Sequence, residues 1–152
     1  IEKSRGKFIA LIDGDGQMPA DDLAVCFIKS KEKQADITMT YRIKRGDGLY
    51  RRTLSYSYNL FVRLLFPTFR IKDLNSKPKI IKRTLIDDLK LSSNGWTIDA
   101  EIMLQALKRK VSISEIPTCF LGQPGGRKSF VGYKAIIEFV IFIIKQRVFG
   151  IK

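Results

Sequence analysis

The chain has 152 residues, of which 45% are hydrophobic and 28% are charged, and its formal net charge is +13. This balance is typical of one globular domain, and the positive charge predicts an anionic partner: nucleic acid, an anionic membrane surface or a phosphorylated substrate. The absence of histidine excludes Ser-His-Asp triads, other His-based acid/base catalysis and His-ligated zinc. The two cysteines, Cys26 and Cys119, have no metal-ligand spacing, which favours a reducing compartment.

The first predicted element is a strand over residues 8–12, because five consecutive apolar residues are too few for a helix and suit a central strand of an α/β sheet. Residues 13–17, Asp-Gly-Asp-Gly-Gln, follow it directly. Ligands collect at the carboxyl ends of such strands, and Mg²⁺ or Mn²⁺ takes one or two carboxylates from protein. The pair Asp13 and Asp15 therefore predicts a divalent-cation site, with an acidic turn as the alternative interpretation.

A helix, a strand and a second helix are predicted next. Pro19 opens a helix expected to turn Leu23, Val25, Phe27 and Ile28 inward. Residues 35–40 predict a short strand that ends at Tyr41-Arg42, followed by a basic loop over 44–48. The helical pattern from 49 to 66 ends at Pro67 and places Arg51 and Ser55 on one face.

The second half of the chain begins with a loop over 70–79 that is rich in cations and turn formers, and that is interpreted as either a functional loop or a solvated turn. A short helix over 83–90, an amphipathic helix over 98–110 and a strand over 111–117 follow. Residues 122–129 form a second glycine-rich basic loop, whose Arg127, Lys128 and Ser129 suit phosphate oxygens.

The last segment, 133–152, contains an apolar run over 135–144 that is about half the roughly 20 residues a membrane-spanning helix requires. The flanking cations suit a helix that lies in the interface of an anionic membrane: Lys134, Lys145, Arg147 and Lys152. A core helix, an oligomer-packing helix and part of a spanning segment that continues past residue 152 are the alternatives.

Several motifs in order resemble the family 2 glycosyltransferases of GT-A fold, and among them the dolichyl-phosphate mannose synthase-like branch. They are I-D-G-D-G-Q-x-P at 12–19, T-Y-R at 40–42, R-R-x-x-S at 51–55, K-D-x-N-x-K-P-K at 72–79, D-A-E at 99–101, E-I-P at 115–117 and G-G-R-K-S at 125–129. The resemblance implies an α/β fold, with residues 1–130 as the C-terminal portion of a GT-A (Rossmann-like) mixed sheet flanked by helices. Residues 131–152 would form an apolar, basic membrane-interface helix. In this family the nucleotide-recognising half precedes the D-x-D, so the resemblance also implies an N-terminally truncated chain, with inactivity of this fragment alone as one alternative.

The activity implied by the resemblance is inverting, divalent-metal-dependent transfer of a sugar from a GDP- or UDP-sugar to polyprenyl or dolichyl phosphate. By position, Asp13, Asp15 and Gln17 would hold Mg²⁺ or Mn²⁺ and the diphosphate, and Asp15 would also be catalytic. The implied substrate-binding residues are Arg42, Arg51, Arg52, Ser55, Asp73, Gln123, Arg127, Lys128 and Ser129. The resemblance also implies an enzyme at the cytoplasmic face of a membrane, peripheral or anchored.

Some alternatives stay open. Asp99 and Glu101 stand where relatives that use hydroxyl acceptors keep a catalytic base, and their other interpretation is charge at a helix N-terminus. A basic nucleic-acid-binding module would explain the charge, but the aromatic residues over 50–69 have helical core spacing rather than that of a stacking surface, so no nucleic-acid partner is expected. A homo-oligomer and a catalytically inactive membrane-associated relative are also possible.

Overall fold

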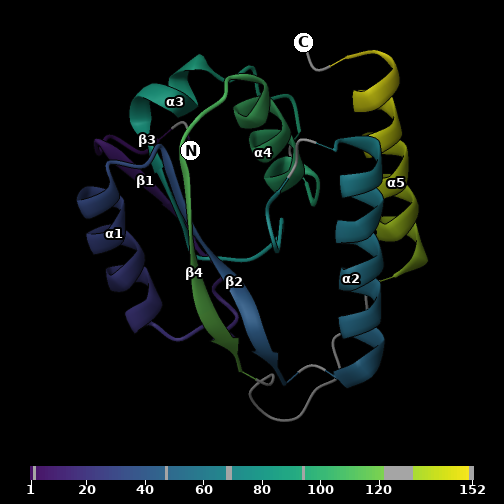
Figure 1. Ribbon diagram of the computed structural model, residues 1–152, viewed down its shortest axis with the longest axis horizontal. Helices are drawn as coiled ribbons and strands as arrows, with labels where there is room; N and C mark the ends of the chain where they lie inside the picture. Colours follow the sequence, from purple (N-terminus) through teal and green to yellow (C-terminus); the bar gives the residue numbers. More distant parts are fainter. Residues whose placement is uncertain (2, 47, 68–69, 94, 122–131, 151–152) are drawn as a thin grey trace.

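The computed structural model describes residues 1, 3–46, 48–67, 70–93, 95–121 and 132–150. Helices and strands alternate through much of this part of the chain (Figure 1). In chain order the elements are β1 (Phe8–Leu11), α1 (Asp21–Lys33), β2 (Ile37–Arg45), α2 (Gly48–Leu65), β3 (Lys79–Lys82), α3 (Arg83–Asp88), α4 (Ile98–Lys108), β4 (Ile113–Phe120) and α5 (Tyr133–Val148).

The strands form a mixed sheet in the order β1-β3-β2-β4. β3 is antiparallel to both of its neighbours, whereas β2 and β4 are parallel. The carboxyl ends of β1, β2 and β4 therefore lie at one edge of the sheet, together with the first residue of β3. This carboxyl edge is where ligands of α/β sheets bind.

The prediction of a central first strand is wrong for the described sheet, because β3 takes the inner position beside β1. The sequence showed only the apolar pair Ile80 and Ile81 at this place, and four residues are too short for a periodic pattern. Ile81 pairs with Ile9 on one side and Ile37 on the other. The buried apolar pair thus joins the two N-terminal strands into one sheet.

Helices cover both faces of the sheet. α1 contacts β2, β3 and β4. The main core contains Ile37 and Met39 of β2 with Ile102 and Met103 of α4. In Figure 1, α1 and α4 lie on opposite sides of the sheet, and α2 and α5 form an outer pair side by side. Tyr58 and Phe139 join these outer helices edge to face, with 5.3 Å between ring centroids.

The predicted inward face of α1 is wrong in part. The side chains of Val25, Phe27 and Ile28 are 41%, 41% and 53% exposed, whereas Cys26 and Ser30 are buried. Small side chains one turn apart allow the helix to approach the sheet closely, and Cys26 Sγ lies 3.9 Å from the carbonyl oxygen of Pro78. Cys26 and Ser30, rather than the larger apolar side chains, thus lie on the side of α1 that packs against the sheet.

β2 is longer than the sequence predicts, because it continues through Arg45 beside β4. The parallel ladder pairs Arg42 with Thr118 and, after an irregularity, Lys44 with Cys119. Arg42 and Lys44 therefore lie within a paired strand. The sequence pattern instead predicts that Lys44 belongs to an unpaired basic loop.

α5 agrees with the expected apolar helix, and its exposed apolar side chains follow one face. Tyr133, Ile137, Ile141, Ile144 and Val148, here called the α5 stripe, are separated by three or four positions. Ile143 of the same helix is buried. Among the described residues, none of the helices has the length and hydropathy needed to cross a bilayer.

Candidate functional site

The loop after β1 carries the two predicted metal ligands at the carboxyl edge. Asp13 and Asp15 are exposed, whereas Gln17 is buried. The Gln17 N–H donates to Asp15 Oδ1 at 3.1 Å, and the Gln17 carbonyl oxygen accepts from the N–H of Leu121 at 2.8 Å. Gly16 has φ +71°, a left-handed conformation that favours glycine. The loop is thus anchored beside the end of β4 and presents its carboxylates outward.

Lys77, two residues before β3, and Lys79, its first residue, connect this loop to α4. Lys77 Nζ lies 2.6 Å from Asp13 Oδ1 and 3.2 Å from Asp99 Oδ2, and Lys79 Nζ lies 2.7 Å from Asp99 Oδ1. Burial lowers the pKa of the fully buried Lys79 despite the opposing effect of Asp99. Burial also acts to lower the pKa of Lys77, but Asp99 and Asp13 outweigh it and raise that pKa. The four side chains form one alternating line of charge.

Asp99, a candidate base from the sequence, lies at the centre of this line. Lys77 and Lys79 were not recognised as site residues, because a lysine-rich loop is ordinarily solvated. The available signal was a pair of lysines flanking Pro78, directly before the apolar residues of β3. Only the pairing of β3 with β1 shows that Lys77 reaches Asp13.

Arg42 and Asp73, both predicted to bind substrate, form a bidentate pair. Arg42 Nε lies 2.6 Å from Asp73 Oδ2, and Arg42 Nη2 lies 2.7 Å from Asp73 Oδ1. The two side chains are 12% and 9% exposed. The Arg42 guanidinium carbon also lies 5.3 Å from the ring centroid of Phe120. The pair fixes the loop before β3 against β2, because a planar fork permits few other orientations.

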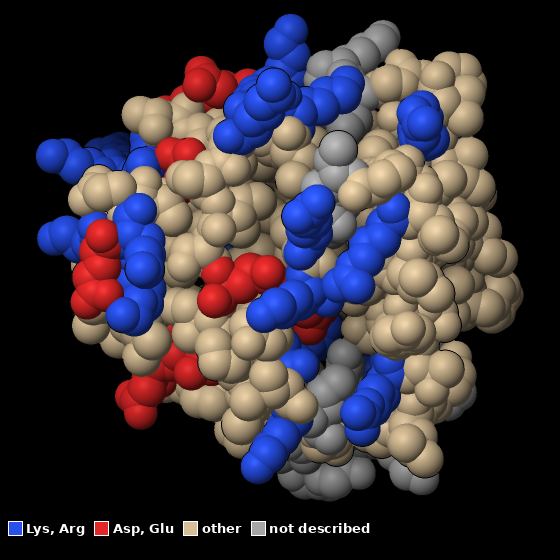
Figure 2. Space-filling view, in the orientation of Figure 1, with Lys and Arg blue, Asp and Glu red and all other residues tan. Residues whose placement is uncertain are grey.

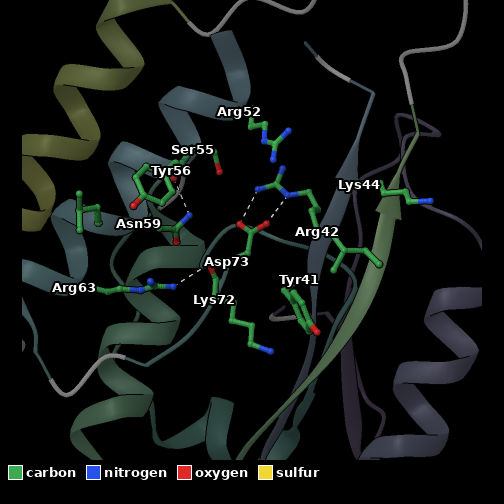
Figure 3. Close-up of a pocket in the computed structure, with 12 residues that line it drawn as sticks. Tyr41, Arg42, Lys44, Arg52, Ser55, Tyr56, Asn59, Arg63, Lys72 and Asp73 are labelled. Carbon is green, nitrogen blue, oxygen red and sulfur yellow. Dashed lines mark hydrogen bonds and ion pairs between the residues drawn. The ribbon is translucent and has the colours of Figure 1, made fainter. Parts of the chain in front are cut away.

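A cavity of about 470 Å³ opens between β2, α2 and the loop that carries Asp73 (Figure 3). Its lining is mostly cationic and polar. In Figure 2, Lys and Arg side chains gather along the middle of the molecule, between the sheet and the outer helices. The lining comprises Tyr41, Arg42, Ile43, Lys44, Arg52, Ser55, Tyr56, Asn59, Leu60, Arg63, Lys72 and Asp73. Such a surface suits a phosphate group.

Side chains of α2 hold the wall of this cavity in place. Asn59 Nδ2 donates to the carbonyl oxygen of Ser55 at 2.9 Å, and Asn59 Oδ1 accepts from the N–H of Leu74 at 3.0 Å. Arg63 Nη2 donates to the carbonyl oxygen of Ile71 at 3.0 Å. Asn59 and Arg63 were not predicted as site residues, although their spacing from Ser55 places all three on one helix face.

Glu101, the other candidate base, is 2% exposed and holds the segment before α4. Its oxygens accept hydrogen bonds from the Ser92 N–H at 3.0 Å, the Ser92 hydroxyl at 2.8 Å and the Ser93 N–H at 2.8 Å. Burial acts to raise the pKa of the carboxyl, but the hydrogen bonds from Ser93 and Ser92 outweigh it and lower that pKa. The contacts give Glu101 a structural role.

The predicted residues thus fall into two groups at one edge. Asp13, Asp15 and Gln17 form the loop after β1, and Arg42, Arg52, Ser55 and Asp73 line the cavity, whereas Arg51 is outside its described lining. The segment between α2 and β3 carries both Asp73 and Lys77 and so connects the two groups. Gln123, Arg127, Lys128 and Ser129 lie outside the described residues. Within the described part, no group of three or more Cys, Asp or Glu side chains forms a ready metal site.

No family model matches the sequence. The structure is similar to that of glucosyl-3-phosphoglycerate synthase from Mycobacterium tuberculosis in complex with phosphoglyceric acid, with a TM-score of 0.70 and 14% sequence identity. The match covers 95% of this chain and 50% of that one, so the chain spans about half the length of that protein. This likeness shows the fold and confirms the predicted class: a GT-A-like mixed α/β sheet flanked by helices. The dolichyl-phosphate mannose synthase-like branch stays a prediction.

Proposed function

We propose that this chain is part of a glycosyltransferase that transfers a sugar from a nucleotide-sugar donor to a phosphate-bearing acceptor. One observation carries the proposal: on a glycosyltransferase fold, the D-x-D loop and a cationic cavity lie at the same edge and are connected by one segment. Ligand sites of α/β sheets occur at this edge, at the carboxyl ends of the strands.

The donor would bind at the D-x-D loop. Its leaving group, a nucleoside diphosphate, develops negative charge as the sugar departs, and preorganised cations stabilise that charge. The exposed Asp15 and the half-exposed Asp13 fit Mg²⁺ or Mn²⁺, which takes few protein carboxylates and completes its shell with water and phosphate. A divalent ion held there would act as a Lewis acid toward the diphosphate. Lys77 adds a fixed cation next to Asp13.

The acceptor would bind in the cationic cavity. Arg52 and Lys72 can neutralise a phosphate group beside the Arg42–Asp73 pair, and the glucosyl-3-phosphoglycerate synthase structure contains phosphoglyceric acid, which also bears a phosphate. A phosphate acceptor is already ionised at neutral pH and needs no general base. This agrees with the engagement of both Asp99 oxygens by lysines. The main task of the protein is then to orient two anions despite their repulsion.

A polyprenyl phosphate is the acceptor we favour, because α5 packs against α2, which lines the cavity, and exposes the apolar side chains of the α5 stripe. Lys134, Lys145 and Arg147 on the same helix complement anionic lipid headgroups. The protein would accordingly work at the cytoplasmic face of a membrane.

The test is a transfer assay with the full-length protein in membranes, using GDP-mannose and UDP-glucose as donors, polyprenyl phosphate as acceptor and Mn²⁺. We expect Asp15→Asn to lower the rate by about 100-fold, because it removes a charge that holds the metal and diphosphate. The control is Asp21→Asn, which removes the same charge from an exposed position in the first turn of α1 and should leave the rate unchanged. Full activity in Asp15→Asn would refute the metal assignment, and failure of the wild type to transfer either sugar would refute transfer from these donors to polyprenyl phosphate.

A further inference from the structure

Lys77 forms an ion pair with Asp13, a carboxylate that the proposed donor site needs to bind its metal ion. Its Nζ lies 2.6 Å from Asp13 Oδ1, and the same nitrogen lies 3.2 Å from Asp99 Oδ2. The Lys77 side chain is 19% exposed and Asp13 is 50% exposed. This pair is therefore the solvent-accessible end of the row of charges that continues inward to Asp99 and Lys79. Asp99 is in turn fixed by the fully buried Lys79 at 2.7 Å.

We propose that Lys77 is a tethered counter-ion: it neutralises Asp13 when the donor site is empty, and when a divalent cation takes Asp13 its ammonium group turns to the donor diphosphate while staying paired with Asp99. This inference rests on the proposed function. It assigns to Lys77 a positioning role at the D-x-D loop.

The two carboxylates around Lys77 are not equivalent, and this makes the exchange feasible. An ammonium group and a divalent cation compete for the same oxygen of Asp13, and the cation brings twice the charge. Asp99 keeps its contact with Lys77 when Asp13 is taken, because Lys79 and the fold of α4 hold Asp99 in place. Lys77 therefore does not lose all of its pairing, and its charge stays within one side-chain length of the incoming phosphates.

The arrangement predicts effects of opposite sign on two ligands. Without nucleotide, Lys77 competes with the metal and weakens its binding. With the diphosphate present, Lys77 adds attraction and strengthens nucleotide binding. A lysine with only a structural role would instead affect both ligands in the same direction, through loss of the folded site.

The test measures binding rather than turnover, in the full-length protein. Free Mn²⁺ is titrated by electron paramagnetic resonance without nucleotide, and GDP and UDP are titrated by calorimetry at saturating Mn²⁺. We expect Lys77→Gln to bind Mn²⁺ about fivefold more tightly and the nucleotide about fivefold more weakly. Lys77→Arg, which keeps the charge, should return both affinities toward the wild-type values.

The matched control is Lys82→Gln, at the other end of β3. Lys82 Nζ pairs with Asp36 Oδ1 at 2.9 Å, so the substitution removes a Lys–Asp pair from the last residue of β3, at the edge of the sheet opposite to Lys77. It should leave both affinities unchanged.

A second measurement uses the wild-type protein and does not depend on the folding of a variant. Amine acylation followed by mass spectrometry should show faster modification of Lys77 when Mn²⁺ is added, and protection when GDP or UDP is added with Mn²⁺, with Lys82 as the internal reference.

The outcomes separate the two proposals. Mn²⁺ binding that is lost in Asp15→Asn but unchanged in Lys77→Gln overturns the role of Lys77 and leaves the metal site standing. Weaker binding of both Mn²⁺ and nucleotide in Lys77→Gln also overturns it, as does a rate of Lys77 acylation that does not change when Mn²⁺ is added. A wild-type protein that binds no Mn²⁺ overturns both the metal assignment and the inference.

Discussion

The ion pair of Arg42 and Asp73 shows how single residues fix the positions of two elements that line the cavity. Two predicted binding residues lie on different elements, one in β2 and one in the segment before β3, and their fork-shaped pairing fixes the distance between those elements. Removing one partner of a largely buried ion pair leaves the other charge uncompensated, which costs more than the pair itself contributes.

We expect Asp73→Asn to lower the free energy of unfolding by about 2 kcal/mol, because Arg42 would keep its charge in a largely buried position. Chemical denaturation followed by circular dichroism measures the change. Glu32→Gln is the control, because Glu32 pairs with Lys29 on the exposed surface of α1 and its loss should leave the midpoint unaltered. Equal midpoints for wild type and Asp73→Asn would show that the pair is energetically neutral.

Glu101 is a second residue whose charge stabilises the fold. Its pKa is below the ordinary value of 4.5 because hydrogen bonds from Ser93 and Ser92 outweigh the effect of burial. A lowered pKa in the folded state means that the stabilisation is complete above about pH 4.5 and is lost as the pH falls through the folded-state value.

The corresponding prediction concerns the acid limb of the stability profile. Wild type should lose stability steeply below about pH 4.5, and Glu101→Gln should be less stable at pH 7 by about 1 kcal/mol with a flatter acid limb. Thermal unfolding at a series of pH values checks both features. Parallel profiles for the two proteins would mean that Glu101 does not titrate with folding.

Among the described elements, α5 is the helix on which the membrane proposal can be tested. One of its sides packs on α2 through Phe139, whereas the α5 stripe faces outward. An exposed apolar face next to cations is typical of helices that lie in the membrane interface.

We expect Ile141→Glu to reduce binding to vesicles of phosphatidylcholine and phosphatidylserine by about tenfold, because it places a negative charge in the middle of the α5 stripe. Vesicle flotation of the full-length protein measures the bound fraction. Val25→Glu on α1 is the matched control, since Val25 is similarly exposed but lies on a helix at the opposite side of the sheet in Figure 1. Equal binding of both variants, or no binding of wild type, would contradict the membrane proposal.

The accuracy of the sequence predictions depended on how distinct a pattern each element carries. The long helices α2 and α4 have enough turns for a 3.6-residue pattern, so their existence and type were predicted correctly. β3 has only two apolar residues between two lysines and was missed, whereas the equally short β1 was predicted because it stands in a run of five apolar residues. The inward face of α1 was wrong because Cys26 and Ser30 pack there through small size, which a hydrophobicity pattern does not detect.

For the whole molecule, the candidate site could be predicted as a set of residues but not as a set of contacts. Asp13, Arg42 and Asp73 were named from ordered motifs. The order and register of β1, β3 and β2 decide which side chains meet: they bring Arg42 to Asp73 and Lys77 to Asp13. A register is decided by long-range packing, and a shift of one residue would reverse the faces of a strand.

The strand order also determines when the site can form as the chain folds. In the described sheet, β1 pairs with β3 through Phe8 and Lys82, and β2 pairs with β4 through Ile37 and Ile113, so both pairings join distant parts of the chain. Contacts between distant residues must await the closure of large loops, which slows folding relative to local helix formation. β1 cannot take its place during synthesis until β3 has left the ribosome. Asp13 therefore meets Lys77 late, after the local helices α1 and α2 have had time to form.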